Sequence, residues 1–480
     1  MTELALNTGL SNLNYLYPLF LLGIVAFVIL AIGIRIENPR LFASITAGAL
    51  AIVFFWLYFL PGNPNLVMSG TTIYNRYGTY FAMIMILASL LVVFPAARRL
   101  SKKADIFYAI LLFVNIGIII ASFSYNILVM FVSFEAVSIG TYIMAAFGKE
   151  KRHLEASLKY FFTSTIATAF TAFGASFFYI STGTFDLTAG LKVSSFQSMD
   201  IALLFLAVGF GFKMAIFPMH QWAIDTYDGA ENSIAAYLST GSKILAFVVI
   251  LKIFLVGFSG DFEVVFYLFT ILAIASMTYG NIAALSQDNL KRILAYSSVA
   301  QVGYLILVLA QVSYVGNTSS HAVTLAVATG MYYSVVYIFM KGGAFLTMNI
   351  VKKDKVEISD VTGLFRKSPA VAVSFSILLL ALAGIPVTGG FFAKYNLFLA
   401  LITGQLWWLA VIAILNSAIS VFYYFRVILY MFKDPVGETD FNLSTSVRIP
   451  VIATAFITVG LGVAFQMVYL LMSVAPGLFG

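Results

Sequence analysis

The residues most able to do chemistry in this chain are charged side chains within stretches that otherwise resemble lipid-spanning helices. Seven of them are basic, and they are Lys159, Lys213, Lys243, Lys252, Lys341, Lys394 and Arg426. One carboxylate, Glu135, stands at a comparable depth. Because a charge in the hydrocarbon region costs about 3 kcal/mol or more, such residues are rare and usually functional. One buried acid and a file of buried bases therefore indicate a route for protons or other cations.

The composition is that of a helical membrane protein. The chain has 480 residues, of which 61% are hydrophobic and only 10% are charged, whereas a soluble domain has about 25% charged residues. Its many apolar runs of about 20 residues favour spanning helices over a barrel. The first run starts near Tyr15 without a basic leader or a cleavage site, so we expect a retained helix. The net charge of +7 fits cationic loops at one membrane face better than nucleic-acid binding.

The same composition argues against several cofactors. The absence of cysteine excludes disulfides, thiolate metal sites and Fe–S ligation by this chain. The three histidines, His153, His220 and His321, are too few and too scattered for haem pairs. The sequence has no P-loop, no dinucleotide-binding fingerprint and no metal-ligand cluster. We therefore expect no cofactor or metal in this chain, so the energy for pumping must come from an ion gradient or from a partner.

The apolar segments predict fourteen spanning helices in one membrane domain covering residues 1–480. They lie at roughly 14–34, 41–60, 77–97, 105–123, 126–147, 158–181, 200–229, 232–257, 264–285, 291–312, 320–350, 370–403, 405–431 and 449–477. An even number places both termini on one side. With the termini outside, that side holds only Arg76 and Lys192 among the loop cations, as the positive-inside rule requires.

One predicted inner loop differs from the others. The connection between the seventh and eighth spans has no cation and instead holds Asp225, Asp228 and Glu231. This exception to the charge bias indicates a loop with a special role.

Two of the predicted spans are too long for one straight crossing, and both contain helix breakers. The seventh has Pro218 in its middle, and the twelfth has Gly384, Pro386 and Gly389. Proline removes a backbone hydrogen bond and clashes with the preceding turn, so each segment should unwind there. Unwound backbone at membrane depth is tolerated only where it lines protein or water.

Paired broken helices are typical of inverted-repeat transport folds. A short sequence echo between 137–142 and 299–304 agrees with a repeat. We therefore expect two five-helix repeats, spans 4–8 within 104–257 and spans 9–13 within 264–431. Residues 1–103 would form the three preceding helices, and 449–477 the last one.

Depth along the spans places Glu135 and Lys213 near each other. At 1.5 Å per residue, Glu135 lies roughly 13 Å into its span, and Lys213 lies roughly 20 Å from the outer end of its own. An ion pair at that depth would keep Lys213 protonated, and withdrawal of Glu135 would leave desolvation to release the proton. The alternative is a static ion pair that only fixes helix packing.

Other buried residues extend this pattern. Lys243 is close to the bilayer centre, too deep to reach water along its side chain, and we predict a proton carrier. Lys394 follows the break of the twelfth span, which favours a hydrated site. His220 follows Pro218 and suits relay work, although a structural histidine bonded to the free carbonyls of the break is the alternative.

The remaining charged residues are ambiguous. Lys159, near the inner end of its span, could serve proton uptake or extend to the membrane surface. Lys252 and Arg426 stand near helix ends, where extension to the surface is the expected behaviour. Lys341, towards the inner surface, and His321, at the outer start of the same span, remain candidates without a definite role.

Several motifs together resemble one family. The segments that carry the resemblance are 211–222 (GFKMAIFPMHQW), 225–229 (DTYDG), 239–243 (STGSK), 288–298 (DNLKRILAYSS), 384–394 (GIPVTGGFFAK) and 416–427 (NSAISVFYYFRV). They are similar to the antiporter-like membrane subunits of respiratory complex I, most of all to subunit N of NADH-quinone oxidoreductases. The resemblance covers nearly all of the chain from the third span onward, and this combination of motifs is highly specific.

The resemblance implies an all-α fold of fourteen helices with inverted repeats at spans 4–8 and 9–13 and broken helices 7 and 12. It implies that Glu135 pairs with Lys213, that Lys243 is the central relay and that Lys394 is the terminal lysine of the second half-channel. His220 would belong to the connecting water chain, and Lys159 would lie near the inner mouth.

It also implies a proton-translocating, non-redox subunit of an NADH-, F420H2- or ferredoxin-quinone oxidoreductase. FMN, Fe–S clusters and quinone would be bound by partner subunits, and the neighbours would be other membrane-arm subunits in the lipid bilayer. The membrane would be a bacterial or archaeal plasma membrane, with a thylakoid-type membrane as the alternative.

Two positions depart from the family pattern. Gln301 stands where many relatives have histidine, and Lys341 stands where subunit N more often has asparagine. A lysine at this position resembles the pattern of Mrp-type Na⁺/H⁺ antiporters. The alternative function is therefore that of a subunit of such an antiporter. A third hypothesis is a scaffold whose buried charges only lock helices together.

Overall fold

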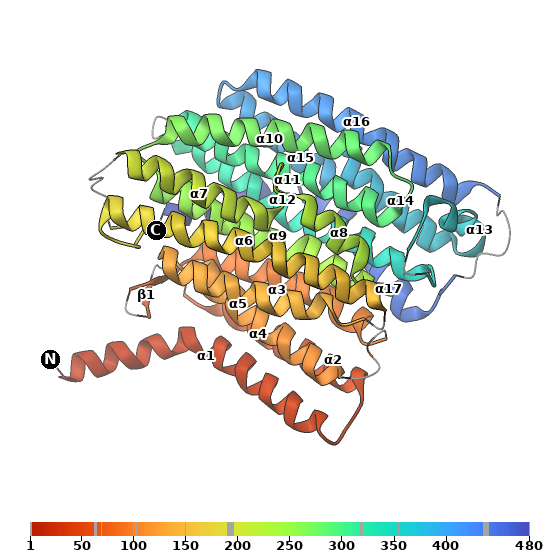
Figure 1. Ribbon diagram of the computed structural model, residues 1–480, viewed down its shortest axis with the longest axis horizontal. Helices are drawn as coiled ribbons and strands as arrows, with labels where there is room; N and C mark the ends of the chain where they lie inside the picture. The colour runs from red at the N-terminus through yellow and green to blue at the C-terminus, as the bar shows by residue number, and fades with distance from the viewer. Residues whose placement is uncertain are drawn as a thin grey trace.

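The computed structural model describes residues 2–61, 65–68, 70–98, 100, 103–148, 150–189, 196–316, 320–353, 355–434 and 441–479. Lys192 of the predicted outer loop lies outside these ranges. The long helices run side by side along one axis, and the N-terminal end of α1 lies at the same end of the bundle as the C-terminus (Figure 1).

Three helices and a hairpin come first. These elements are α1 (Thr2–Gly33), α2 (Pro39–Phe59), β1 (Asn65–Val67), β2 (Thr72–Tyr74) and α3 (Arg76–Ala96). The two short strands pair antiparallel, with Leu66 opposite Ile73. Helix α2 begins where the Asn38 side chain accepts from the amides of Arg40 and Leu41, with Pro39 in the first turn.

The first predicted repeat corresponds to six helical elements. They are α4 (Ala104–Phe123), α5 (Ile127–Ala145), α6 (Lys151–Thr182), α7 (Phe196–Met214), α8 (Gln221–Gly229) and α9 (Asn232–Lys252). A π-helical turn, η1 (Ile253–Gly257), extends α9.

The second predicted repeat is followed by a short C-terminal region. Its elements are α10 (Phe262–Leu285), α11 (Leu290–Val315), α12 (Ser320–Thr347), η3 (Met348–Ile350), η4 (Ile358–Val361), α13 (Leu364–Lys367), α14 (Pro369–Ala383), α15 (Gly389–Thr403) and α16 (Trp407–Phe432). The chain ends with α17 (Thr445–Val463), α18 (Met467–Leu471) and η5 (Ala475–Phe479).

The predicted helix count and both breaks are confirmed. Within the described ranges, 13 helices are long and apolar enough to cross a membrane, and the fourteenth crossing is made by α14 and α15 together. The seventh span unwinds between Met214 and Gln221 around Pro218, and the twelfth between Ala383 and Gly389 around Pro386. The fold is therefore that of an all-α, multi-pass membrane protein.

The last predicted helix is shorter than expected, because α17 ends at Val463 instead of continuing to 477. Its final turns contain Gly460 and Gly462, and glycine is a poor helix former. Gly462 has a packing reason, since a Cβ there would come 2.5 Å from the Val387 carbonyl oxygen. This close approach seats α17 against the break of the twelfth span.

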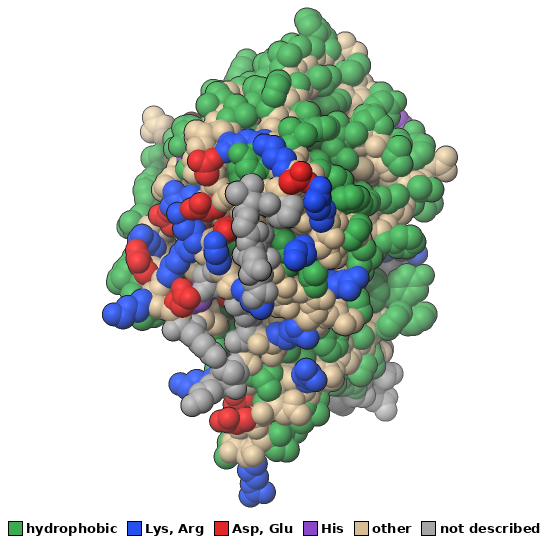
Figure 2. Space-filling view, turned by 90° about the vertical axis from the view of Figure 1, so that its right-hand side faces the viewer, with side chains coloured by type: hydrophobic (Ala, Val, Ile, Leu, Met, Phe, Trp, Pro, Cys, Tyr) green, Lys and Arg blue, Asp and Glu red, His purple; other side chains and the backbone are tan. Residues whose placement is uncertain are grey.

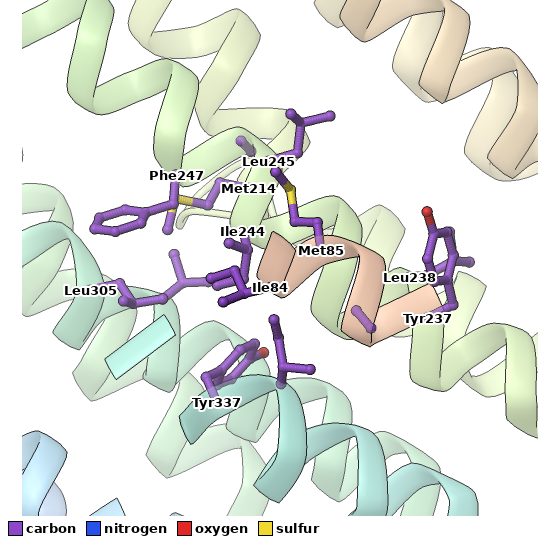
Figure 3. Close-up of a cluster of buried hydrophobic side chains, with 14 of the residues drawn as sticks. Ile84, Met85, Met214, Tyr237, Leu238, Ile244, Leu245, Phe247, Leu305 and Tyr337 are labelled. Carbon is purple, nitrogen blue, oxygen red and sulfur yellow. The ribbon is translucent and has the colours of Figure 1, made fainter. Parts of the chain in front are cut away.

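The core is formed by α9, α11 and α12, which are buried along nearly their whole length. Their apolar side chains meet those of α3 and α7 in one cluster, in which Met85, Met214, Phe247, Leu305 and Tyr337 come from five different helices (Figure 3). By contrast, only 28% and 33% of the residues in the apolar stretches of α1 and α6 are buried. The outer α1 is the more apolar helix, with a mean hydropathy of 2.6 against 1.9 for α9, as expected where lipid covers it. The lysines of α9 and α12 are therefore held inside the protein, away from lipid.

Charged side chains gather at one end of the bundle. Lys and Arg side chains crowd the end where α1, α3, α5 and α10 finish, on the right of Figure 1 and facing the viewer in Figure 2. We call this end the cationic face and define it by Arg40, Arg98, Arg152, Arg292 and Lys352, which begin or end the helices there.

Candidate functional site

The predicted contact between Glu135 and Lys213 is present. Lys213 lies in the last turn of α7, and its Nζ is 3.2 Å from Glu135 Oε1 of α5. The lysine side chain is 3% exposed and the carboxylate 21%. The pair therefore joins a lysine in the protein interior to a carboxylate at the edge of the bundle.

Three hydroxyl groups complete the surroundings of the Lys213 ammonium. Its Nζ donates to Ser138 Oγ at 2.7 Å, to Tyr142 OH at 3.1 Å and to Ser164 Oγ at 2.7 Å. Tyr142 also donates to Ser164 in a short hydrogen bond. Charge-assisted hydrogen bonds of this kind stabilise an ammonium, so Glu135 is not its only support.

Sequence reasoning missed these hydroxyls. Ser138 and Tyr142 lie three and seven residues after Glu135, on the same face of α5, so helical spacing could have found them. Ser164 comes from α6, and no local pattern in the sequence connects it with α7.

The break of the seventh span is stabilised by side chains from outside it. Trp222 donates its indole N–H to the Phe212 carbonyl oxygen at 2.7 Å, and the Phe217 amide donates to Ser276 Oγ at 3.0 Å. Both bonds satisfy backbone groups that lose their helical partners at the break. His220 is buried there, with its ring 4.7 Å from the Tyr279 ring between centroids. The break thus leaves a titratable ring inside the bundle.

Lys243 lies in the middle of α9 and is fully buried. Among the described residues its Nζ has no hydrogen-bond partner, and neither does the Thr226 hydroxyl of α8. The closest favourable contact is the Tyr227 ring, whose centroid lies 5.5 Å away. An unpartnered buried amine is costly in its charged form, which suits a group that gains and loses a proton.

Lys394 of α15 reaches back to the end of the preceding half-helix. Its Nζ donates to the carbonyl oxygens of Leu382 and Ala383 at 3.0 and 3.1 Å, and to Ser417 Oγ at 2.9 Å. The first two are carbonyls at the C-terminus of α14 that accept from side chains, Gln301 at Leu382 and Ser417 at Ala383, as well as from Lys394. The helix dipole attracts a cation to this end. Gly384 ends α14 with φ +86°, and a Cβ there would lie 3.0 Å from Lys394 Cδ. Glycine at 384 therefore makes room for the lysine.

Lys341 belongs to the same buried region. It is fully buried in α12, and its Nζ donates to Ser297 Oγ of α11 at 2.7 Å. Gln301 lies one turn further along α11, where its Nε2 donates to the Leu382 carbonyl oxygen at 3.0 Å. The candidate site thus runs from α5 through α9 to α15.

Two of the predicted site residues lie apart from it. Lys159 is paired with Glu155 at 2.8 Å, with side chains 53% and 65% exposed. His321 is exposed at the start of α12. Neither belongs to the buried set formed by the other lysines.

The prediction that Lys252 extends to the membrane surface is wrong. The side chain is fully buried, and its Nζ donates to the carbonyl oxygens of Ser122 and Ser124 and lies 4.2 Å from the centroid of the Tyr125 ring. The reason is that α9 is surrounded by other helices at both ends. Arg426 is partly exposed and binds Asp288, as expected near a helix end.

The acidic loop predicted to be special is a charge junction at the cationic face. Asp228 accepts from Arg152 of α6 at 2.6 Å and from Arg292 of α11 at 3.2 Å, and Asp225 pairs with Arg292 at 3.1 Å. Glu231 caps α9 by accepting from the Ser233 amide at 2.8 Å. Asp225 and Asp228 lie within α8 itself, so the predicted loop is mostly helix, and its carboxylates join α8 to α6 and α11.

Comparison with known proteins identifies the class. Residues 124–420 match the family model described as NADH:quinone oxidoreductase/Mrp antiporter, TM. The chain belongs to this family. The same part of the molecule contains Glu135, Lys213, Lys243, Lys341 and Lys394.

Individual relatives show which members of the family this chain resembles. The chain is 33% identical to F420H2 dehydrogenase subunit N of Methanosarcina mazei, over 94% of each chain, and 33% identical to NADH-quinone oxidoreductase subunit N 1 of Solibacter usitatus, over 89% of each. It superimposes on a chain of respiratory complex I from Thermus thermophilus with bound aureothin with a TM-score of 0.82, at 29% identity, covering 94% of this chain and 98% of that one. The resemblance to the antiporter-like subunits of complex I is confirmed.

Among the described residues, no three His, Asp or Glu side chains form a group able to hold a metal.

Proposed function

We propose that this chain is the subunit N type proton translocator of a quinone-reducing complex, and that protons move along Glu135, Lys213, Lys243 and Lys394. The observation that carries the proposal is the buried contact between Glu135 and Lys213, followed by two further lysines in the interior. The relatives whose names include NADH-quinone oxidoreductase and F420H2 dehydrogenase support this class of complex.

Each residue has a role that follows from its surroundings. Glu135 and the hydroxyls around Lys213 stabilise the Lys213 ammonium, and displacement of the carboxylate weakens that support. The proton then passes towards Lys243, which has no fixed counter-charge, with His220 at the break beside this route. Lys394 receives it at the C-terminus of α14, where carbonyl oxygens stabilise the ammonium.

The remaining features of the proposal concern the assembly. The electron donor, FMN, Fe–S clusters and quinone belong to partner subunits, and this chain is a non-redox member of the membrane arm beside other antiporter-like subunits. The cationic face lies on the inner side of a bacterial or archaeal plasma membrane, and both termini lie outside. Residues 104–257 and 264–431 are the two inverted repeats.

The test uses the complex purified with its partners. Lys213→Met should lower proton pumping about tenfold or more, because it removes a proton-transfer group. Lys159→Met is the matched control, since its lysine is exposed and paired with Glu155, and we expect pumping within about twofold of normal. Normal pumping by a fully assembled Lys213→Met complex would contradict the proposed relay.

A second candidate function is that of a Mrp-type Na⁺/H⁺ antiporter subunit. The buried Lys341 favours it, because the family model covers both classes and subunit N more often has asparagine at this position. Mass spectrometry of the co-purified partners distinguishes the two. Fe–S and donor-binding subunits support the quinone-reducing complex, whereas a set of membrane subunits alone supports the antiporter.

A further inference from the structure

A hydrogen-bonded path leads away from Lys341 through groups that the relay above does not use. Lys341 Nζ donates to Ser297 Oγ at 2.7 Å, and Ser297 shares a short hydrogen bond with the Tyr424 hydroxyl of α16. All three side chains are fully buried. A serine hydroxyl that accepts from an ammonium can still donate its own proton. Ser297 can therefore accept from the Lys341 ammonium and donate to the Tyr424 oxygen, which leaves the Tyr424 proton for another acceptor.

Gln301 lies between this path and Lys394. Its Nε2 donates to the Leu382 carbonyl oxygen at 3.0 Å, which also accepts from Lys394 at 3.0 Å. Its Oε1 accepts a short hydrogen bond from Tyr333. An amide side chain offers donors and acceptors but has no ionisable group. Gln301 can therefore orient the carbonyl that Lys394 uses, but a proton must pass beside it.

We propose that Ser297 and Tyr424 form a hydroxyl bridge that carries protons between Lys341 and Lys394, with Gln301 as a positioning residue. This inference rests on the proton-relay function proposed above. In one transfer, the Lys341 ammonium gives a proton to Ser297 Oγ while the Ser297 proton moves to the Tyr424 oxygen. The Tyr424 proton moves to a water molecule, which protonates the neutral amine of Lys394. One N–H bond breaks at Lys341 and one forms at Lys394, and every group between them keeps its number of protons.

The internal sequence echo supports this assignment. Aligning 137–142 with 299–304 places Ser297 at the position of Glu135. Each residue contacts a buried lysine, Glu135 at 3.2 Å from Lys213 and Ser297 at 2.7 Å from Lys341. A hydroxyl adds no fixed negative charge that would hold the proton on the lysine. The second position is therefore suited to passing a proton on.

The chain offers a matched control beside each member of the bridge. Ser298 is as buried as Ser297, but its hydroxyl accepts from Tyr337 at 3.3 Å. Tyr423 is as buried as Tyr424, but its hydroxyl donates to Asn281 Oδ1 at 3.0 Å. Each control has the same chemistry and a neighbouring place in the same helix, and its hydroxyl has a hydrogen-bond partner outside the bridge. Tyr423 also packs against Tyr424, with ring centroids 4.3 Å apart, so replacing it changes the surroundings of Tyr424 as well.

The first experiment measures protons pumped per quinone reduced in the purified complex. Ser297→Ala and Tyr424→Phe should each lower this ratio about tenfold, because each removes a proton-transfer group. Ser297→Thr keeps the hydroxyl and should restore the ratio to within about twofold. Ser298→Ala should leave the ratio unchanged, and Tyr423→Phe should lower it much less than Tyr424→Phe does, because the Tyr423 proton is donated to Asn281 outside the bridge. Equal pumping by Tyr424→Phe and Tyr423→Phe complexes would overturn the bridge.

The second experiment keeps the tyrosine and changes only its acidity. Ring-fluorinated tyrosine is nearly the size of tyrosine but loses its proton at lower pH. Incorporated at 424, it should change the number of protons pumped per quinone reduced, whereas the change at 423 should be smaller. This result decides the question even when Tyr424→Phe fails to assemble, and an unchanged ratio at 424 contradicts the bridge.

The two proposals can fail separately. When Lys213→Met abolishes pumping and every hydroxyl variant pumps normally, the bridge is wrong and the lysine relay stands. When Lys213→Met itself pumps normally, the proposed function fails.

Discussion

The two halves of the molecule place their buried lysines in different electrostatic surroundings. In the first half, Lys213 contacts a carboxylate and three hydroxyls. In the second half, among the described residues, Lys341 and Lys394 donate hydrogen bonds to hydroxyls and backbone carbonyls and contact aromatic rings, but no carboxylate pairs with them. A full opposite charge holds a proton on an amine more firmly than dipoles do. In the proposed relay, the first half therefore holds a proton until Glu135 moves, and the second half transfers it.

The two helix breaks show a related difference. Lys213 lies before its break, in the last turn of α7, whereas Lys394 lies after its break and returns to the last carbonyls of α14. Both ammonium groups are thus associated with the C-terminal end of the first half-helix, which carries the negative end of the helix dipole. A lysine before the break and a lysine after the break therefore both lie near the negative end of a half-helix.

The largest effect is expected at Lys243, where the two halves meet. Lys243→Met should lower proton pumping about a hundredfold, because it removes the buried amine between Lys213 and Lys394 in the proposed relay. The ratio of protons pumped to quinone reduced in the purified complex measures this. Pumping above about a tenth of normal would contradict a connection through Lys243, since protons would then pass between the two halves by another route.

A somewhat smaller effect is expected at Lys394. Lys394→Arg keeps the positive charge but cannot release its proton near neutral pH, so pumping should fall about tenfold or more. The complex should still assemble, because arginine can donate to the same carbonyls. Normal pumping by this variant would show that Lys394 acts only as a fixed charge.

A moderate effect is expected at Glu135. Glu135→Gln should reduce pumping less than Lys213→Met does, by about three- to tenfold, because Ser138, Tyr142 and Ser164 still stabilise the ammonium. Measuring both variants side by side sharpens the contrast between the halves. Equal losses would mean that the hydroxyls contribute little.

The smallest effect on pumping is expected at Lys252, which lies outside the relay. Lys252→Met should leave pumping per assembled complex normal but destabilise the protein by about 1–3 kcal/mol, because the carbonyls of Ser122 and Ser124 lose their donor. Thermal unfolding of the purified complex tests the second part. A pumping defect without a stability defect would instead add Lys252 to the relay.

Much of the fold could be predicted because its signals are local. Hydropathy sets the spans, and the chemistry of Pro218 and Gly384 sets the breaks. Depth along two spans was enough to bring Glu135 and Lys213 together. These features depend on chain distance or on single residues, and both can be taken directly from the sequence.

The features that the sequence does not predict depend on which helix lies at the centre of the bundle. Lys252 was misplaced because its position near a helix end does not reveal that α9 is surrounded by other helices. The contacts of Lys213 with Ser164 and of Lys394 with the Leu382 carbonyl join separate elements. The contact of Lys394 is with a backbone carbonyl, and every residue has such a group, so the sequence does not indicate it.

The most direct test of the central claim is a double-variant measurement on the two halves. Lys213→Met, Lys394→Met and the combined variant are compared for protons pumped per quinone reduced in the purified complex. If one serial relay connects the halves through Lys243, the combined variant pumps no less than the worse single variant, because either block already stops the same path. If the two losses multiply, the halves conduct independently and the single relay is contradicted.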